Sequence, residues 1–211
     1  EPGDPYCYLE LHVEQGPTLE ERGVPIGIVE GVDGFAWLDA AFEGRADHAG
    51  PTPMHRRRDA LVAAADVVTA VRRVASSEGD DLVGTVGHLG VSPDSINVVP
   101  ERVECTIDVR SADDAVVDRA VDRLEAELRC AARREGVDAT VEEIMRIESA
   151  TFDPAIIETV ERITDARGVD SIRLQSGAGH DASYLDRVCP TGMIFVPSAD
   201  GISHAEDEFT E

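Results

Sequence analysis

The chain has 211 residues, of which 42% are hydrophobic, and 43 acidic against 19 basic residues give it a formal net charge of −24 at pH 7. This length suits one or two domains with a substantial core. So strong a negative charge argues against binding to nucleic acids or anionic membranes, because both require a basic surface. Every basic residue is an arginine, and acid enrichment without lysine is typical of a protein from a high-salt cytoplasm; an acidic protein from an ordinary cell is the alternative.

A cytoplasmic location is also expected from the cysteines and the hydrophobic pattern. Cys7, Cys105, Cys130 and Cys189 are far apart and form no CxxC pair, which favours small buried side chains in a reducing compartment. No apolar run approaches the length needed to span a bilayer, and the first residues do not have the pattern of a signal peptide.

The first predicted element is a strand in the segment ELHVEQG, residues 10–16. Apolar and polar residues alternate from Leu9 to Glu14, which indicates a strand with one buried face and one polar face. His12 lies between two glutamates on the polar face, near the end of the strand. Metal sites are often built at such positions; a solvated histidine on an acidic surface is the alternative.

Residues 18–34 predict a hairpin or the edge of a sheet, and a more regular unit follows over about residues 33–150. Its expected elements are a strand at 35–42, a loop at 44–54, a helix on 61–75, a strand at 82–89, a turn at 93–100, a strand at 103–109, a helix on 117–131 and a strand at 139–147. Ser111 and Asp114 resemble a capping box for the second helix, which Gly136 ends. This order is the split βαβ pattern of a ferredoxin-like sandwich, an antiparallel sheet with two helices on one face.

Past residue 150 the pattern is that of a different, α/β domain. A helix begins at Asp153-Pro154 and ends at Gly168, followed by a strand at 171–175, a Gly-rich loop with a short helix, and a strand at 193–196. We therefore predict an α/β (α+β) chain in which residues 1–32 and 151–211 form one domain. The ferredoxin-like unit, residues 33–150, is inserted between its two segments.

Four of the six histidines lie at a strand end or in Gly-rich loops, where function is often located: His12, His48, His180 and His204. Histidines flanked by carboxylates at strand ends fit a metal site. Exposed loop histidines are the alternative. A Ser–His–Asp nucleophile with Ser176 or Ser203 is a rival, but the chain has no GxSxG motif.

Five motifs, in this order, resemble one enzyme family: ELHVEQG, GRADHAGPTPM with the downstream RRRDAL, SINVVP followed by TIDVR, GAGHDA, and GISHAEDE. The chain is similar from about residue 6 onward to N-carbamoyl-amino-acid hydrolases, allantoate amidohydrolases and β-ureidopropionases. The resemblance implies a zinc-peptidase-like α/β catalytic domain with a ferredoxin-like lid that also forms a homodimer. It further implies two divalent metal ions, zinc or manganese with cobalt or nickel as alternatives, and a small ureido or N-acyl amino acid as substrate.

The same resemblance implies roles for individual residues. His12 would be a ligand of one metal and His204 a ligand of the other. His48 and His180 would polarise the scissile carbonyl and stabilise the oxyanion. The substrate would be bound by Asn97, Gln15 and Arg110. Of these, Arg110 would bind the carboxylate of the substrate. An ion pair of Arg110 with Asp108 or Asp113 is the alternative for that arginine.

The family's earlier segment, with a His-x-Asp motif, a bridging aspartate and a Glu-Glu pair that includes the general base, has no counterpart in this sequence. We therefore expect a fragment that is inactive alone, although its parent is the hydrolase. The alternatives are a stand-alone dimerisation or ligand-binding module, or an N-acyl-amino-acid or dipeptide hydrolase.

Overall fold

The computed structural model describes residues 5–78, 82–203 and 205–210 and divides into two compact units. We call Gly34–Glu148 the sandwich unit, and Glu1–Asp33 with Ser149–Glu211 the α/β unit. Within the described residues, no helix has both the length and the apolar character required to cross a membrane. The fold is a mixed α/β one in which a ferredoxin-like sandwich interrupts an α/β domain.

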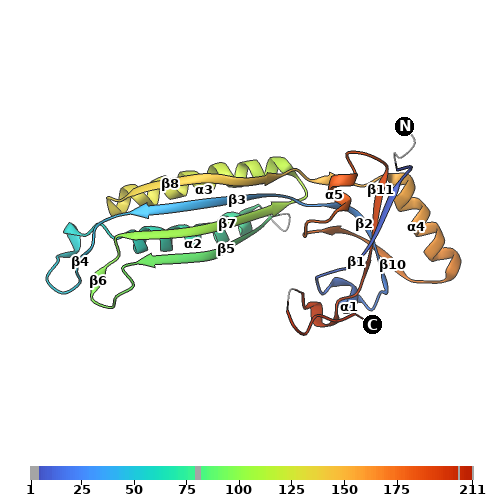
Figure 1. Cartoon of the computed structure of the whole chain (residues 1–211), viewed down its shortest axis with the longest axis horizontal. Helices are drawn as coiled ribbons and strands as arrows, with labels where there is room; N and C mark the ends of the chain where they lie inside the picture. Colours follow the sequence, from blue (N-terminus) through green and yellow to red (C-terminus); the bar gives the residue numbers. More distant parts are fainter. Residues whose placement is uncertain (1–4, 79–81, 204, 211) are drawn as a thin grey trace. The chain divides into compact units, whose positions relative to one another are not determined.

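The sandwich unit is a four-stranded antiparallel sheet with two helices on one face (Figure 1). The strand order is β5-β7-β3-β8, which is the ferredoxin-like order. Its elements are β3 (Gly34–Glu43), α2 (Ala60–Ser77), β5 (Val83–Ser92), β7 (Arg102–Ser111), α3 (Asp114–Glu135) and β8 (Asp138–Ile147). The loops between them contain a 3-10 turn at Met54–Arg56 and a two-stranded ladder of β4 (Asp47–His48) with β6 (Val98–Val99).

Both helices form because apolar residues recur every three or four positions and pack against the sheet. Asp59 caps α2 by accepting hydrogen bonds from the backbone N–H groups of Leu61 and Val62. The predicted capping box of α3 is wrong: Asp113 is the N-cap and accepts from Ala115 N, while Ser111 Oγ accepts from Asp113 N. Asp113 occupies the N-cap position because its short carboxylate reaches the first turn from directly before the helix.

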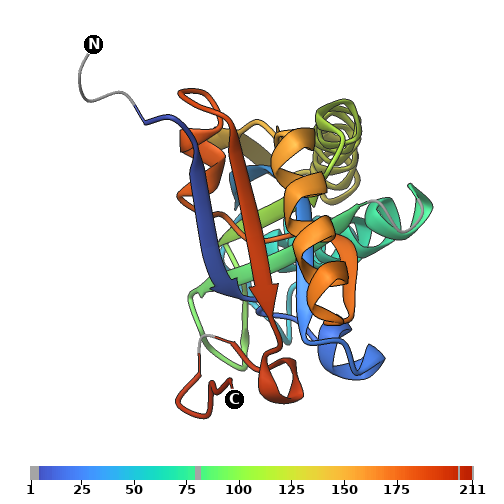
Figure 2. The ribbon, with the colours of Figure 1, turned by 90° about the vertical axis from the view of Figure 1, so that its right-hand side faces the viewer.

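The α/β unit contains a five-stranded mixed sheet in the order β1-β11-β2-β10, with β9 also pairing with β2. Figure 2 shows β1 and β11 running side by side, and these strands are parallel. The elements are β1 (Tyr8–Val13), α1 (Thr18–Arg22), β2 (Ile26–Val32), β9 (Ala150–Thr151), α4 (Pro154–Arg167), β10 (Ser171–Ser176), α5 (Ala182–Leu185), β11 (Thr191–Val196) and a 3-10 turn at Ala199–Gly201. Phe152, Phe195 and Leu19 are among the buried side chains of its core.

Two expectations for the start of the chain are wrong. Residues 18–22 form the helix α1, not part of a hairpin, and β2 is an interior strand rather than an edge. The faces of β1 are also reversed: Leu11 is 68% exposed, whereas Glu14 on the polar face is 8% exposed. A period of two distinguishes the two faces of a strand but does not say which face is covered.

Candidate active site

Three side chains of the α/β unit bring potential metal ligands together: Glu10 and His12 on β1, and His180 in the loop between β10 and α5. One ligand atom from each residue lies within 4.8 Å of the others. The two imidazole rings meet edge to face, with centroids 4.6 Å apart. Two histidines and a carboxylate are a donor set that suits zinc and similar divalent ions.

The backbone fixes how His12 presents its ring. His12 Nδ1 is 2.8 Å from the carbonyl oxygen of Val13. A carbonyl only accepts hydrogen bonds, so Nδ1 carries the hydrogen and donates it. In the neutral ring this leaves a lone pair on Nε2, and metal-binding histidines are commonly oriented by such a bond from the other nitrogen.

His180 is a buried, neutral histidine whose side chain is 1% exposed. Burial, and secondarily the neighbouring His12, lowers the pKa of His180 to about 4. Its Nε2 lies 2.8 Å from Ser176 Oγ, and its Nδ1 lies 3.8 Å from Glu10 Oε1. The imidazole is therefore held between a hydroxyl on one side and a carboxylate on the other, in the uncharged form that can bind a metal.

The contact between Ser176 and His180 does not support a Ser–His–Asp nucleophile. Ser176 Oγ is within hydrogen-bonding distance of His180, but the residue is 2% exposed and its hydroxyl also contacts the backbone of Ala178. Ser203 interacts with Gln15 and Glu208 rather than with a described histidine. Ser176 is better described as the residue that holds the His180 ring.

Glu10 was not among the site residues predicted from the sequence. One oxygen faces His180, and the other accepts a 2.8 Å hydrogen bond from the backbone N–H of Ala182, at the start of α5. Glu10 therefore ties β1 to the segment that carries His180. Glu10 lies on the same strand face as His12, which could have indicated it, but its hydrogen bond with Ala182 joins residues 172 positions apart.

Gln15 directly follows β1 in a left-handed conformation, with φ of 60°. Its side-chain amide donates to Ser203 Oγ at 3.1 Å, and its backbone N–H donates to Ser198 Oγ at 2.9 Å. Ser203 Oγ in turn donates to Glu208 at 3.3 Å. The predicted metal ligand His204 lies outside the described residues. A non-glycine residue held at positive φ is typical of a functional segment.

In the sandwich unit, the structure brings His48 and Asn97 together. The ladder of β4 and β6 pairs His48 with Val98, and the backbone N–H of Ala49 donates to the carbonyl of Asn97. His48 is exposed, and its Nδ1 accepts from the N–H of Gly50 at 3.0 Å. The neutral ring consequently carries its hydrogen on Nε2, as a donor.

Arg110 lies in the four-stranded sheet, where it pairs with Phe35 near the start of β3, whereas the separate β4–β6 ladder lies beyond the other end of β3 (Figure 1). Asp108 accepts from its Nε at 3.0 Å and from a terminal nitrogen at 2.6 Å. The guanidinium carbon also lies 5.1 Å from the Phe35 ring centroid, over its face. The ion pair expected as an alternative is therefore present with Asp108, while Asp113 caps α3.

Comparison with known proteins gives a consistent result over the whole chain. Residues 1–211 match the sequence profile of peptidase family M20/M25/M40. The N-carbamoyl-L-amino-acid amidohydrolase of Paenarthrobacter aurescens is 40% identical over 205 residues, which cover 97% of this chain and 50% of that protein. The allantoate amidohydrolase of Bacillus subtilis (strain 168) is 33% identical over 204 residues, with 97% and 50% covered.

A solved structure agrees with the sequence relatives. The crystal structure of an amidase of the hydantoinase/carbamoylase family from Burkholderia multivorans superposes with a TM-score of 0.94 at 41% identity, covering 99% of this chain and 51% of that one. The chain thus spans about half the length of the curated relatives it matches. Because the family profile covers the chain from end to end, this protein belongs to peptidase family M20/M25/M40.

Proposed function

We propose that this chain is part of a metal-dependent amidohydrolase that cleaves the ureido C–N bond of N-carbamoyl amino acids or allantoate. The observation that carries the proposal is the cluster of Glu10, His12 and His180, in a chain whose relatives are named for this activity. Because His12 Nδ1 bonds the carbonyl of Val13, the neutral ring has its lone pair on Nε2, which fits a divalent metal. Zinc, manganese, cobalt and nickel all accept such ligands.

The metal would be held by His12 Nε2 with Glu10 Oε1 as the neighbouring donor atom, and His204 is the proposed ligand of a second ion. A bound divalent ion supplies Lewis acidity, which polarises a carbonyl and lowers the pKa of coordinated water. Among the chain's own groups, His48 would donate its Nε2–H to the scissile carbonyl, and His180 would stabilise charge beside it. We assign no general base to this chain, and we therefore propose that it is inactive alone.

Substrate binding would be shared between Arg110 for the carboxylate and Asn97 and Gln15 for the polar ureido group. Arg110 and the pair His48–Asn97 lie at opposite ends of β3, more than about 25 Å apart for a strand of this length. No N-carbamoyl amino acid spans that distance. If both ends contact one substrate, two copies of the chain must contribute to each site.

The dimer would form through the sandwich unit, and its two edge strands differ in charge. β8 carries Asp138, Glu142, Glu143 and Arg146, whereas the ten residues of β5 include no Asp, Glu or Arg. Charged residues protect natural edge strands from pairing with another chain. In a protein with a net charge of −24, the uncharged β5 edge is the one we propose to pair with a second copy.

Metal binding tests the cluster directly. Isothermal titration of the purified chain with Zn²⁺ or Mn²⁺ should show binding that His12→Ala abolishes and that His55→Ala, at an exposed position, leaves unchanged. In the complete enzyme, ammonia release from N-carbamoyl amino acids should exceed hydrolysis of N-acetyl amino acids. Faster cleavage of the acetyl compounds would favour the N-acyl hydrolase instead, and hydrolysis by this chain alone would contradict its inactivity.

Two variants test the shared site. His48→Ala and Arg110→Ala enzymes should each be inactive, but random pairing of the two in a two-fold dimer should restore about a quarter of wild-type activity. No recovery after mixing and reassociation would contradict a site built from two copies. Leu89→Asp on β5 should give monomers by light scattering, while Met145→Asp on β8, at a position equally 42% exposed, should not.

A further inference from the structure

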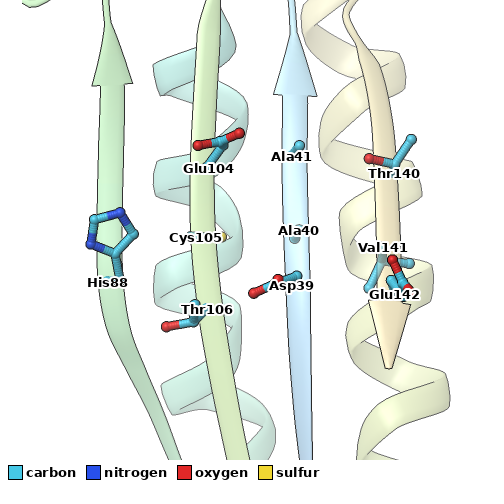
Figure 3. Close-up of a pocket in the computed structure, with 10 residues that line it drawn as sticks. All are labelled: Asp39, Ala40, Ala41, His88, Glu104, Cys105, Thr106, Thr140, Val141 and Glu142. Carbon is cyan, nitrogen blue, oxygen red and sulfur yellow. The ribbon is translucent and has the colours of Figure 1, made fainter. Parts of the chain in front are cut away.

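Two hollows follow one another on the face of the sandwich sheet that is opposite α2 and α3. Figure 3 looks onto the first, a pocket of about 460 Å³ with His88 on β5 and the carboxylates of Asp39, Glu104 and Glu142 on the other three strands. The second, of about 310 Å³, is lined by Trp37, Thr85, Gly87, Thr106, Asp108 and Ile144. We call this second hollow the Trp37 pocket. We call the first hollow the acidic pocket; the two hollows share Thr106 in their linings.

Two irregularities in strand pairing create the Trp37 pocket. On β5 the register with β7 shifts between Val86 and His88, so that Gly87 is the extra residue. On β8 the register with β3 shifts so that Ile144 is the extra residue. Both shifts occur level with Ile107 of β7. Bulges redirect side chains and are frequent beside active sites. Here one bulge adds an apolar wall, and the other, a glycine, leaves space.

Charge distinguishes the two hollows. The acidic pocket has three carboxylates in its lining, of which Glu104 is paired with Arg102. The Trp37 pocket has one, Asp108, and its charge is balanced by Arg110 at 2.6 Å. An anionic ligand on this face would therefore be repelled by the acidic pocket and much less by the Trp37 pocket beside Arg110.

We propose that the Trp37 pocket binds the apolar side chain of an N-carbamoyl amino acid whose carboxylate is held by Arg110. This inference rests on the proposed function and adds a preference to it: leucine-like or aromatic side chains over glycine. Arg110 and Asp108 are two residues apart on β7, about 6.6 Å along the strand. That separation is comparable with the length of a large side chain, so one ligand can reach both the guanidinium and the pocket.

The sequence contains a single tryptophan, Trp37, and this provides a direct assay. Titration of the whole chain with N-carbamoyl-L-leucine should change the Trp37 emission, with a dissociation constant at least about fivefold lower than for N-carbamoylglycine, because part of the leucine side chain leaves water. N-carbamoyl-L-leucinamide, which lacks the carboxylate, should bind several-fold more weakly than the acid. Hydrolysis is not required, so failure of the proposed activity is distinguished from failure of the pocket.

A variant that fills the pocket completes the test. A Cβ atom at Gly87 would meet only Thr106 Oγ1, at 3.5 Å, so Gly87→Val adds volume without a backbone clash. This variant should lose the preference for the leucine compound while binding N-carbamoylglycine as before. Gly87→Ala, a smaller addition, should have an intermediate effect and guards against misfolding of the valine variant. Equal binding of the leucine and glycine compounds, or no binding of either, would overturn the inference.

Discussion

Replacing Glu14 with glutamine should destabilise the α/β unit at the turn that follows His12. Glu14 is buried, and its two oxygens accept hydrogen bonds from the backbone N–H groups of Thr18, at 2.8 Å, and Leu19, at 2.7 Å. Pro17, the residue at the N-cap of α1, provides no side-chain cap, so Glu14 satisfies these donors from outside the helix.

The magnitude follows from the two bonds. A hydrogen bond to a charged acceptor contributes about 1.5–3 kcal/mol, and a neutral one about 1 kcal/mol. The glutamine keeps one acceptor, but its amide nitrogen would face the second backbone N–H, leaving that buried donor without a partner. We expect Glu14→Gln to lower the free energy of unfolding of the α/β unit by about 2–4 kcal/mol.

Urea unfolding followed by far-UV circular dichroism measures the loss, and hydrogen exchange at the Thr18 and Leu19 amides locates it. Glu20→Gln is the matched control, because Glu20 lies on the same helix but is exposed, and it should change stability by less than about 0.5 kcal/mol. An effect of Glu14→Gln no larger than that of the control, or unchanged exchange at Thr18 and Leu19, would refute this account of the turn.

Three further predictions concern pH, salt and the sandwich core. The pKa of His180 is about 4 in the fold against 6.5 ordinarily, so the unfolded chain takes up the proton first. In the metal-free chain, the stability that neutral His180 contributes should be fully present above about pH 6.5 and be lost as the pH falls through 4. In urea unfolding, His180→Gln should flatten this pH dependence, and an unchanged slope would contradict the prediction. Raising NaCl from about 0.1 to 1 M shortens the Debye length from about 10 to 3 Å, which should raise the melting temperature by screening a net charge of −24; a decrease would show that screened ion pairs dominate. Phe42→Ala, at a fully buried site, should cost about 3–5 kcal/mol, monitored by Trp37 emission, whereas Val62→Ala on the exposed side of α2 should cost under about 1 kcal/mol.

The regular elements of the sandwich unit were predictable because each carries a strong local period. The helix on 61–75 and the strand on 103–109 correspond to α2 and β7 with ends extended by a few residues. The helix α1 has no such period: it is five residues long and depends on the carboxylate of Glu14, which precedes it. Residues 18–22 therefore contain no local pattern that separates one helical turn from a hairpin.

The candidate site was predictable in its histidines but not in its geometry. Glycine-rich loops indicated His48 and His180, yet nothing in the spacing brings Glu10 to Ala182 or Ser176 to His180. The strand order β1-β11-β2-β10 separates β1 from β10 by two strands, and the loop after β10, with the start of α5, returns to Glu10 and His12. Contacts of this kind depend on sheet topology, which one sequence does not reveal.

The reversed faces of β1 can be explained by the hydrogen-bond partners of its polar side chains. Burying Glu14 and partly burying Glu10 and His12 would be unfavourable if their polar atoms lacked partners. Each of them has one: Glu10 receives the N–H of Ala182, His12 donates to Val13, and Glu14 receives the N–H groups that open α1. Because backbone groups supply these bonds, the strand can turn its polar face inward, with the His12 ring 4.6 Å from that of His180. The bonds from backbone groups involve only Nδ1 of His12 and Oε2 of Glu10, and we therefore propose that the other nitrogen and the other oxygen face a metal ion.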